Sequence, residues 1–256
     1  MDHRFTSSGL KLAAHLSEPP PSSVPAPVAP PGLVLCHGFP VRGRESPASG
    51  KSFPELADRI ATEMGWIVLT INFRGCGLSE GNFSMGGWQA DIHAAAAHVR
   101  SVGATDVWLA GFGTGSALCI AEAAVDRTIA GVAAMATPAD FEDWGRNPRR
   151  LLLHSREVGV VKDAAFPPSF DRWASEIRSL NPAAAAGELS DRPLLLLHGE
   201  NDDLVPSMDT RILADAHGSA EMHMISGAGH ELRHDPRAVA ILLGWLGRQQ
   251  NAVMAR

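Results

Sequence analysis

Two histidines and a glutamate lie close together near the end of the chain. Residues 230–234 read HELRH, which matches the H-E-x-x-H pattern. On an α-helix this spacing puts two imidazoles on one face, where they bind zinc, and supplies a glutamate base. Here the segment precedes Asp235-Pro236, a helix-start signature, so we expect a loop. A zinc peptidase acting through His230, Glu231 and His234 is therefore a remote alternative, and we expect neither a metal nor a cofactor.

Thiols are a second source of nucleophilic chemistry. The three cysteines (Cys36, Cys76 and Cys119) are too few and too scattered for a disulfide framework, which favours a reducing, cytoplasmic location. Cys36 ends an apolar segment, and we expect it in the core. Cys76 lies in a glycine-rich loop and is a candidate nucleophile as a thiolate, although filling a packed turn is the commoner role for such a residue.

Segments typical of strands and of helices alternate along most of the chain. This order predicts an α/β protein with a mostly parallel sheet covered by helices. We expect an opening antiparallel pair at residues 4–8 and 10–17. Further strands are predicted at 32–36, 66–72, 107–110, 129–134, 193–197 and 221–225. Helices are predicted at 54–64, 84–102 (with Ser84 as its cap), 116–125 and 207–216, and from 236 onward.

Residues 137–190 interrupt this alternation and are rich in Arg, Pro and Trp. We expect them to form a small cap inserted into a single domain that spans residues 1–256. Four aromatic side chains of the segment are expected either to line a pocket mouth or to dock the cap on the body: Trp144, Phe166, Phe170 and Trp173.

Five short motifs each follow a predicted strand. They read HGF at 37–39, NFRGCGLS at 72–79, GFGTG at 111–115, HGENDDLVP at 198–206 and GAGH at 227–230. In this order they resemble the motifs of the α/β-hydrolase superfamily, whose attacking serine lies in a G-x-S-x-G turn between a strand and a helix. The resemblance covers about residues 30 to 250 and implies a pocket above the carboxyl ends of the central strands.

The resemblance also implies roles for individual residues. His230 corresponds to the base, and Asp202 to the acid that orients it, with Asp203 as the competing choice. The backbone N–H groups of Phe39 and Thr114 correspond to the oxyanion hole. The implied partner is a small acyl- or ester-like molecule, and the oligomeric state stays open.

The attacking serine of the family is missing, because Gly113 stands in its place. In a serine protease, loss of the serine alone costs about 10⁶-fold in turnover, so we do not expect conventional serine-esterase activity. Ser116 falls in the first turn of a helix, and the turn is expected to direct Thr114 away from the histidine. Two interpretations remain. The protein is either a hydrolase, in which His230 activates water or Cys76 attacks the substrate, or a ligand-binding protein without catalytic activity.

Charge and hydropathy indicate the kind of partner. The formal net charge is −6, so a nucleic acid or an anionic membrane is not expected to bind. No apolar run approaches the roughly 20 residues of a membrane span, and the first residues contain no signal-like apolar segment. Arg42, Arg44 and Lys51 form a basic loop that either steers an anionic substrate or is simply solvated.

Overall fold

The computed structural model describes residues 2–21, 29–41 and 52–254, so the basic residues at 42, 44 and 51 lie outside the described part. The strands are β1 (Asp2–Ser7), β2 (Leu10–Ser17), β3 (Gly32–Cys36), β4 (Ile67–Ile71), β5 (Val107–Phe112), β6 (Ile129–Met135), β7 (Leu194–Gly199) and β8 (Glu221–Ile225). The α-helices are α1 (Ser52–Met64), α2 (Met85–Ser101), α3 (Thr114–Val125), α4 (Glu142–Arg146), α5 (Pro148–Glu157), α6 (Phe170–Ser179), α7 (Pro182–Gly187), α8 (Ser207–His217) and α9 (Pro236–Met254).

The described strands form one sheet in the order β1-β2-β4-β3-β5-β6-β7-β8. β1 and β2 pair antiparallel, β2 is antiparallel to β4, and every later pairing is parallel. The mostly parallel sheet and its antiparallel opening pair are thus confirmed. Strands β3, β4, β5 and β7 are buried along their whole length, as expected for parallel strands covered on both faces.

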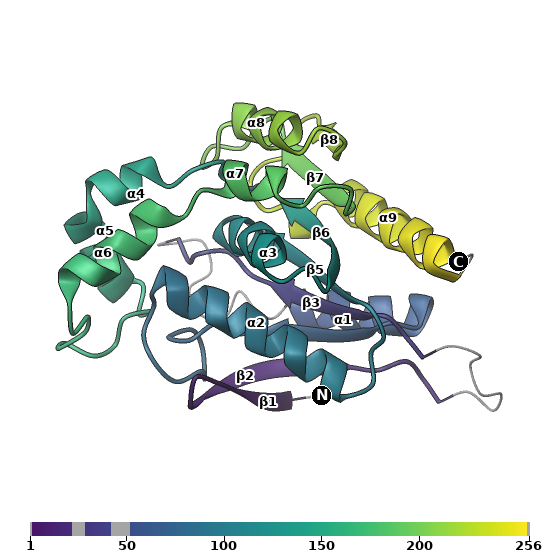
Figure 1. The fold of residues 1–256 in the computed structure, drawn as a ribbon, viewed down its shortest axis with the longest axis horizontal. Coiled ribbons are helices and arrows are strands. Elements are labelled where there is room, and N and C mark those ends of the chain that lie inside the picture. The colour runs from purple at the N-terminus through teal and green to yellow at the C-terminus, as the bar shows by residue number, and fades with distance from the viewer. Residues whose placement is uncertain (1, 22–28, 42–51, 255–256) are drawn as a thin grey trace.

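Helices cover both faces of this sheet (Figure 1). On one face, Trp88 of α2 and Leu118 of α3 belong to a core that also takes in apolar residues of the inserted helices. On the other face, Ile60 of α1 and Trp245 of α9 belong to a second core. No helix in the described ranges combines the length and apolar character needed to cross a bilayer.

Two helix starts show how the sequence places α2 and α3. The predicted cap of α2 is confirmed, because the Ser84 hydroxyl accepts a hydrogen bond from the Gly87 N–H at 3.0 Å. Helix α3 begins at Thr114, two residues earlier than predicted. Its first turn already closes on the Gly113 carbonyl, which accepts from the Ser116 N–H at 3.1 Å. The turn at Gly113 therefore passes directly from strand into helix.

Helices α4 to α7 lie between β6 and β7, in the segment expected to form a cap. Hydrogen bonds join this segment to the loop before α2. The Asn82 side-chain oxygen accepts from the backbone N–H groups of Lys162 and Asp163, at 2.7 and 3.0 Å. The Trp173 indole N–H donates to the Phe83 carbonyl at 3.0 Å. Residues 162, 163 and 173 are thus fastened to the body of the domain.

A further hydrogen bond joins two of the inserted helices to each other. The Arg178 guanidinium of α6 donates from Nε to the Gly145 carbonyl of α4 at 3.1 Å. Helix α4 is therefore linked through α6 to the same attachment points.

Candidate active site

Gly113 forms the turn between β5 and α3. Its φ is 53° and its ψ is −126°, a conformation that costs a non-glycine residue on the order of 1–3 kcal/mol and that glycine adopts freely. The Gly113 N–H donates to the Met135 carbonyl at 2.9 Å, which ties the turn to the end of β6. The turn is therefore held by two neighbouring strands, β5 through the chain and β6 through this hydrogen bond.

Ser116 supports this turn from inside the protein. Its side chain is fully buried, and its hydroxyl bonds the Gly113 carbonyl at 2.6 Å and the Thr137 hydroxyl at 2.7 Å. These contacts give the Ser116 hydroxyl a structural role, in line with its expected place in the first helical turn.

The structure brings His230 and Asp202 together, 28 residues apart in sequence. The Nδ1 of His230 lies 2.9 Å from Oδ2 of Asp202, whose side chain is only 1% exposed. The other oxygen, Oδ1, accepts from the backbone N–H groups of Leu204 and Val205, each at 2.9 Å. Although burial raises the pKa of Asp202, the hydrogen bonds from His230, Val205 and Leu204 outweigh it and lower that pKa. In the neutral imidazole, an ionised Asp202 favours the tautomer with the proton on Nδ1, in which Nε2 is the acceptor.

His198 and Thr210 lie behind this pair, and sequence reasoning did not single out either of them as functional. His198 is fully buried, and its Nε2–H donates to the Val205 carbonyl at 3.0 Å. The same nitrogen lies 3.5 Å from Oδ2 of Asp202. The Thr210 hydroxyl bonds Nδ1 of His198 at 2.6 Å. The only sequence signal was that His198 opens the HGENDDLVP motif.

His230 faces the turn at Gly113. A Cβ atom added to Gly113 would lie 3.4 Å from Nε2 of His230 and 3.7 Å from the Cα of Gly38. A side chain at position 113 would therefore point at Nε2 of the imidazole. The space that a serine would fill lies directly in front of the base.

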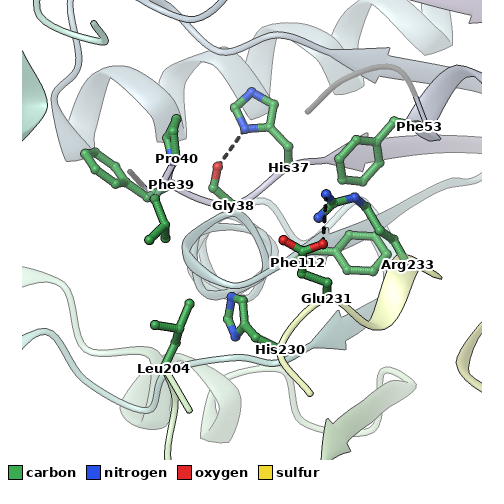
Figure 2. Close-up of a pocket in the computed structure, with 11 residues that line it drawn as sticks. His37, Gly38, Phe39, Pro40, Phe53, Phe112, Leu204, His230, Glu231 and Arg233 are labelled. Carbon is green, nitrogen blue, oxygen red and sulfur yellow. Dashed lines mark hydrogen bonds and ion pairs between the residues drawn. The ribbon is translucent and has the colours of Figure 1, made fainter. Parts of the chain in front are cut away.

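The loop after β3 forms the opposite side of this space (Figure 2). The Nδ1–H of His37 donates to the Gly38 carbonyl at 2.7 Å, and its Nε2 accepts from the Phe73 N–H at 3.3 Å. Burial lowers the pKa of His37 to about 4, so the ring is neutral at pH 7. A Cβ on Gly38 would lie 3.0 Å from the Phe112 carbonyl, so a larger residue would push this loop away from β5 by a few tenths of an ångström.

Phe39 and Thr114 lie on either side of the turn. Phe39 directly follows Gly38, and Thr114 is the first residue of α3, so its N–H has no acceptor within the helix. Both residues line the same pocket as Gly113 and His230. The predicted pair of anion-binding amides is thus close to the turn and the base.

Two cavities meet at His230. The larger, which we call the large pocket, has a volume of about 570 Å³ and is lined by Gly113, Thr114 and His230. The smaller, which we call the small cavity, has a volume of about 50 Å³ and is drawn in Figure 2. Phe39, Leu204 and His230 border both. The small cavity is large enough to hold water beside the base.

Cys76 lies apart from these cavities. It is buried in the core on the α2 face and lines neither the large pocket nor the small cavity. Burial raises the pKa of its thiol and outweighs the opposing effect of Lys162, while the Asp91 carboxylate adds a smaller rise. A buried thiol that resists ionisation is a poor nucleophile, so this placement disfavours Cys76 as the attacking group.

The aromatic residues of the inserted segment divide between the two roles expected for them. Trp144 lines the large pocket. Trp173 is 2% exposed and packs on Phe83, with ring centroids 6.2 Å apart. Phe166 and Phe170 pack partly buried against the same core and do not line the large pocket.

The HELRH segment does not form the helix that a zinc peptidase needs. Only Leu232–His234 is helical, as a short 3-10 helix, so His230 and His234 do not share one face of an α-helix. His230 is bonded to Asp202, whereas His234 lies 3.6 Å from the Glu231 carboxylate. This geometry disfavours zinc binding by the segment.

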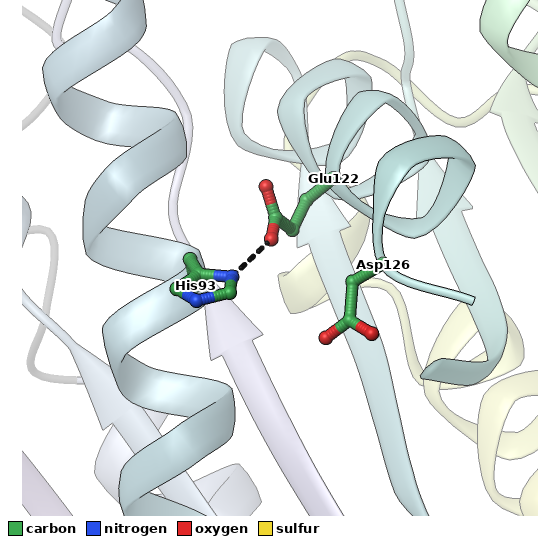
Figure 3. A group of neighbouring side chains, drawn as sticks. All are labelled: His93, Glu122 and Asp126. Carbon is green, nitrogen blue, oxygen red and sulfur yellow. Dashed lines mark hydrogen bonds and ion pairs between the residues drawn. The ribbon is translucent and has the colours of Figure 1, made fainter. Parts of the chain in front are cut away.

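Elsewhere in the described part of the chain, His93, Glu122 and Asp126 place three ligand-type atoms within 4.8 Å of one another (Figure 3). The exposed His93 bonds the buried Glu122 carboxylate at 2.8 Å. Asp126 is bonded by the Thr128 hydroxyl at 2.6 Å and by Arg100 at 3.3 Å. His93 and Glu122 are thus partners of each other, Asp126 is bonded by Thr128 and Arg100, and the positive charge of the Arg100 guanidinium opposes the binding of a cation.

Comparison with known proteins agrees with this architecture. Residues 33–242 match the family model described as "Alpha/beta hydrolase family". The chain therefore belongs to the α/β-hydrolase family, as its motifs predict. No curated protein matches the sequence.

Several solved structures share the fold. Est1E from Butyrivibrio proteoclasticus, solved with ferulic acid bound, has a TM-score of 0.74 at 18% identity, and the match covers 99% of this chain and 100% of that one. An esterase domain from a Rhodothermus marinus protein has a TM-score of 0.68 at 20% identity, covering 97% and 96%. A meta-cleavage product hydrolase from Pseudomonas fluorescens has a TM-score of 0.67 at 15% identity, covering 96% and 98%. Similarity at this level of identity concerns the fold.

Proposed function

We propose that this protein hydrolyses a small acyl- or ester-like molecule by activating water in place of a serine. The observation that carries the proposal is the geometry at the turn. The Nε2 of His230 faces the position where a Gly113 side chain would begin, at 3.4 Å, and Asp202 holds Nδ1 at 2.9 Å. The small cavity next to His230 has room for the attacking water.

The reaction uses only groups of this site. His230 takes a proton from water at Nε2, and the water oxygen forms a bond to the carbonyl carbon of the substrate. The carbonyl oxygen becomes an oxyanion, which the N–H groups of Phe39 and Thr114 stabilise. When the intermediate collapses, the bond to the leaving oxygen breaks and His230 returns the proton to it. The products are a carboxylic acid and an alcohol, and the base is regenerated.

A second candidate function is supported by the same glycine. Because Gly113 removes the family's nucleophile, the large pocket would then bind a small ligand without converting it. In either case we propose a small molecule as the partner and the cytoplasm as the location. The location is supported by the cysteines, since Cys36, Cys76 and Cys119 are all free and buried.

The test is a pair of measurements on p-nitrophenyl esters of short acids. If water is the attacking group, the natural protein hydrolyses one of them slowly, and His230→Ala lowers that rate about 100-fold or more, since a general base contributes about 10²–10⁴-fold. A rate that is unchanged in His230→Ala contradicts the hydrolase proposal and favours the silent ligand-binding protein.

Gly113→Ser tests the alignment directly. The new Oγ would start from a Cβ lying 3.4 Å from Nε2 of His230, so we expect much faster ester hydrolysis and labelling by a fluorophosphonate. Gly113→Ala is the matched control, because it imposes the same backbone strain without a hydroxyl. If the serine variant folds, as judged by circular dichroism, and stays unlabelled, the assignment of His230 and Asp202 is wrong.

A further inference from the structure

Among the described residues that line the large pocket, negative charges outnumber positive ones. Four of its lining side chains are carboxylates, whereas one lysine or arginine, Arg146, lines its described part. The carboxylates belong to Asp140, Glu142, Asp143 and Asp209. Arg146 is ion-paired with Glu142 one helical turn away, so its charge is already neutralised within the wall. Three carboxylates remain without that compensation.

Asp209 is the carboxylate of this wall that comes from helix α8. It is half-buried at the start of α8, and its Oδ2 accepts from the Ala139 N–H at 3.0 Å. Burial raises the pKa of Asp209, and the negative charge of Asp140 adds to that rise. A cation bound in the pocket would relieve this repulsion.

Aromatic rings make up another part of the same wall. The rings of Phe39 and Trp144 meet edge to face, with centroids 5.1 Å apart, and those of Phe141 and Trp144 are 5.2 Å apart. All three residues line the large pocket. Ring faces attract cations, most strongly when the cation is desolvated, and several rings together are a common way to bind an ammonium group.

This wall lies in the same pocket as the reacting groups. Gly113, Thr114 and His230 also line the large pocket, and its volume of about 570 Å³ falls within the roughly 300–1,000 Å³ typical of small-ligand sites. A small molecule in this pocket can therefore contact both the charged and aromatic wall and the base.

We propose that the large pocket selects a substrate with a cationic head group, a primary or quaternary ammonium, attached to the acyl or ester group that faces His230. The part concerning conversion rests on the proposed function, whereas recognition of the cation depends only on the pocket. The carboxylates attract the ammonium and repel anionic analogues, and the rings favour the ammonium over an uncharged group of equal shape.

The first experiment measures binding to the natural protein by calorimetry at low ionic strength. Choline is compared with dimethylbutanol, the uncharged molecule in which carbon replaces the nitrogen, and with dimethylbutyrate as an anion. We expect choline to bind about tenfold more tightly than dimethylbutanol, the equivalent of about 1.4 kcal/mol, and dimethylbutyrate to bind least. Asp143→Asn and Trp144→Leu should each reduce the preference for choline. Asp215→Asn, which removes an exposed carboxylate of α8 outside the pocket, should leave it unchanged.

Equal binding of choline and dimethylbutanol overturns the proposal, as does tighter binding of dimethylbutyrate. The latter result would point to the basic residues Arg42, Arg44 and Lys51, which the described part of the structure does not include. A second experiment separates this inference from the proposed function, using p-nitrophenyl esters with neutral and trimethylammonium acyl chains on Gly113→Ser. Turnover without preference for the cationic ester contradicts the inference alone. A choline preference without any turnover contradicts the proposed function alone.

Discussion

The two oxygens of Asp202 have different tasks. Oδ1 accepts from the N–H groups of Leu204 and Val205, and Oδ2 accepts from His230. In Asp202→Asn the amide oxygen would keep the two backbone donors, which turns the NH₂ group toward His230. The imidazole would then accept at Nδ1 and carry its proton on Nε2, where it cannot act as a base.

We therefore expect Asp202→Asn to fold normally and to lose ester hydrolysis by about 10⁴-fold when introduced into Gly113→Ser, as this exchange does in a serine protease. Steady-state kinetics measure the loss, and thermal unfolding shows that the fold is kept. A loss of less than tenfold would mean that another group orients His230.

The resemblance to the α/β-hydrolase motifs predicted the pairing of His230 with Asp202, and the structure has the two side chains in contact, each in a loop that follows a strand. The same reasoning could not exclude Cys76. The motif around Cys76 spans only residues 72–79, but the burial of this loop also depends on residues far away in the sequence. One of them is Val160, whose carbonyl lies next to Gly75 and accepts from the Phe83 N–H at 2.9 Å. The carboxylates of the large pocket were missed for a similar reason, since Asp143 and Asp209 come from different helices.

A buried ion pair joins helix α2 to the turn after β4. Asp91 of α2 is fully buried and accepts from the backbone N–H of Arg74 at 2.9 Å and from its guanidinium at 2.7 Å. The Arg74 side chain is itself only 13% exposed. Removing one partner leaves the other charge buried and unpaired, which typically costs about 3–5 kcal/mol.

Asp91→Ala should therefore lower the free energy of unfolding by about 3–5 kcal/mol, measured by guanidinium denaturation. Arg59→Ala is the control: it breaks an exposed ion pair with Glu63 one helical turn away and should change stability by less than about 1 kcal/mol. Equal effects of the two substitutions would show that the ion pair between Arg74 and Asp91 does not stabilise the contact between α2 and the turn after β4.

The positions of the regular elements were predictable because apolar runs of strand length alternate with helical segments. The observed boundaries differ from the predicted ones by one or two residues. Helix α3, for example, begins at Thr114, because the Gly113 carbonyl already accepts the first hydrogen bond of the helix. The individual helices of the inserted segment were not predicted. Helices α4 and α7 have only five and six residues, too short to show a helical repeat in the sequence.

At the scale of the whole molecule, His37 links folding to pH. Burial holds its pKa at about 4, whereas an unfolded histidine has a pKa near 6.5. Between these values the unfolded chain binds a proton that the folded protein does not, so stability falls as the pH falls. This one group should remove about 2 kcal/mol of stability between pH 7 and pH 5.

The measurement is guanidinium denaturation of the natural protein and of His37→Asn at both pH values. Asparagine retains a donor near the Gly38 carbonyl but does not titrate, so the variant should show a smaller loss on acidification. An identical pH dependence in His37→Asn would contradict the assignment.

The hydrogen bonds that the inserted segment donates to Asn82 and Phe83 restrict how that segment can move when a ligand enters. Swinging helices α4 to α6 outward as a hinged lid would break the bonds to Lys162, Asp163 and Trp173 at the same time. We therefore expect the pocket to keep its shape when empty. Leu204, which is 42% exposed, borders both cavities, and we expect a ligand to enter past this side chain without movement of helices α4 to α6.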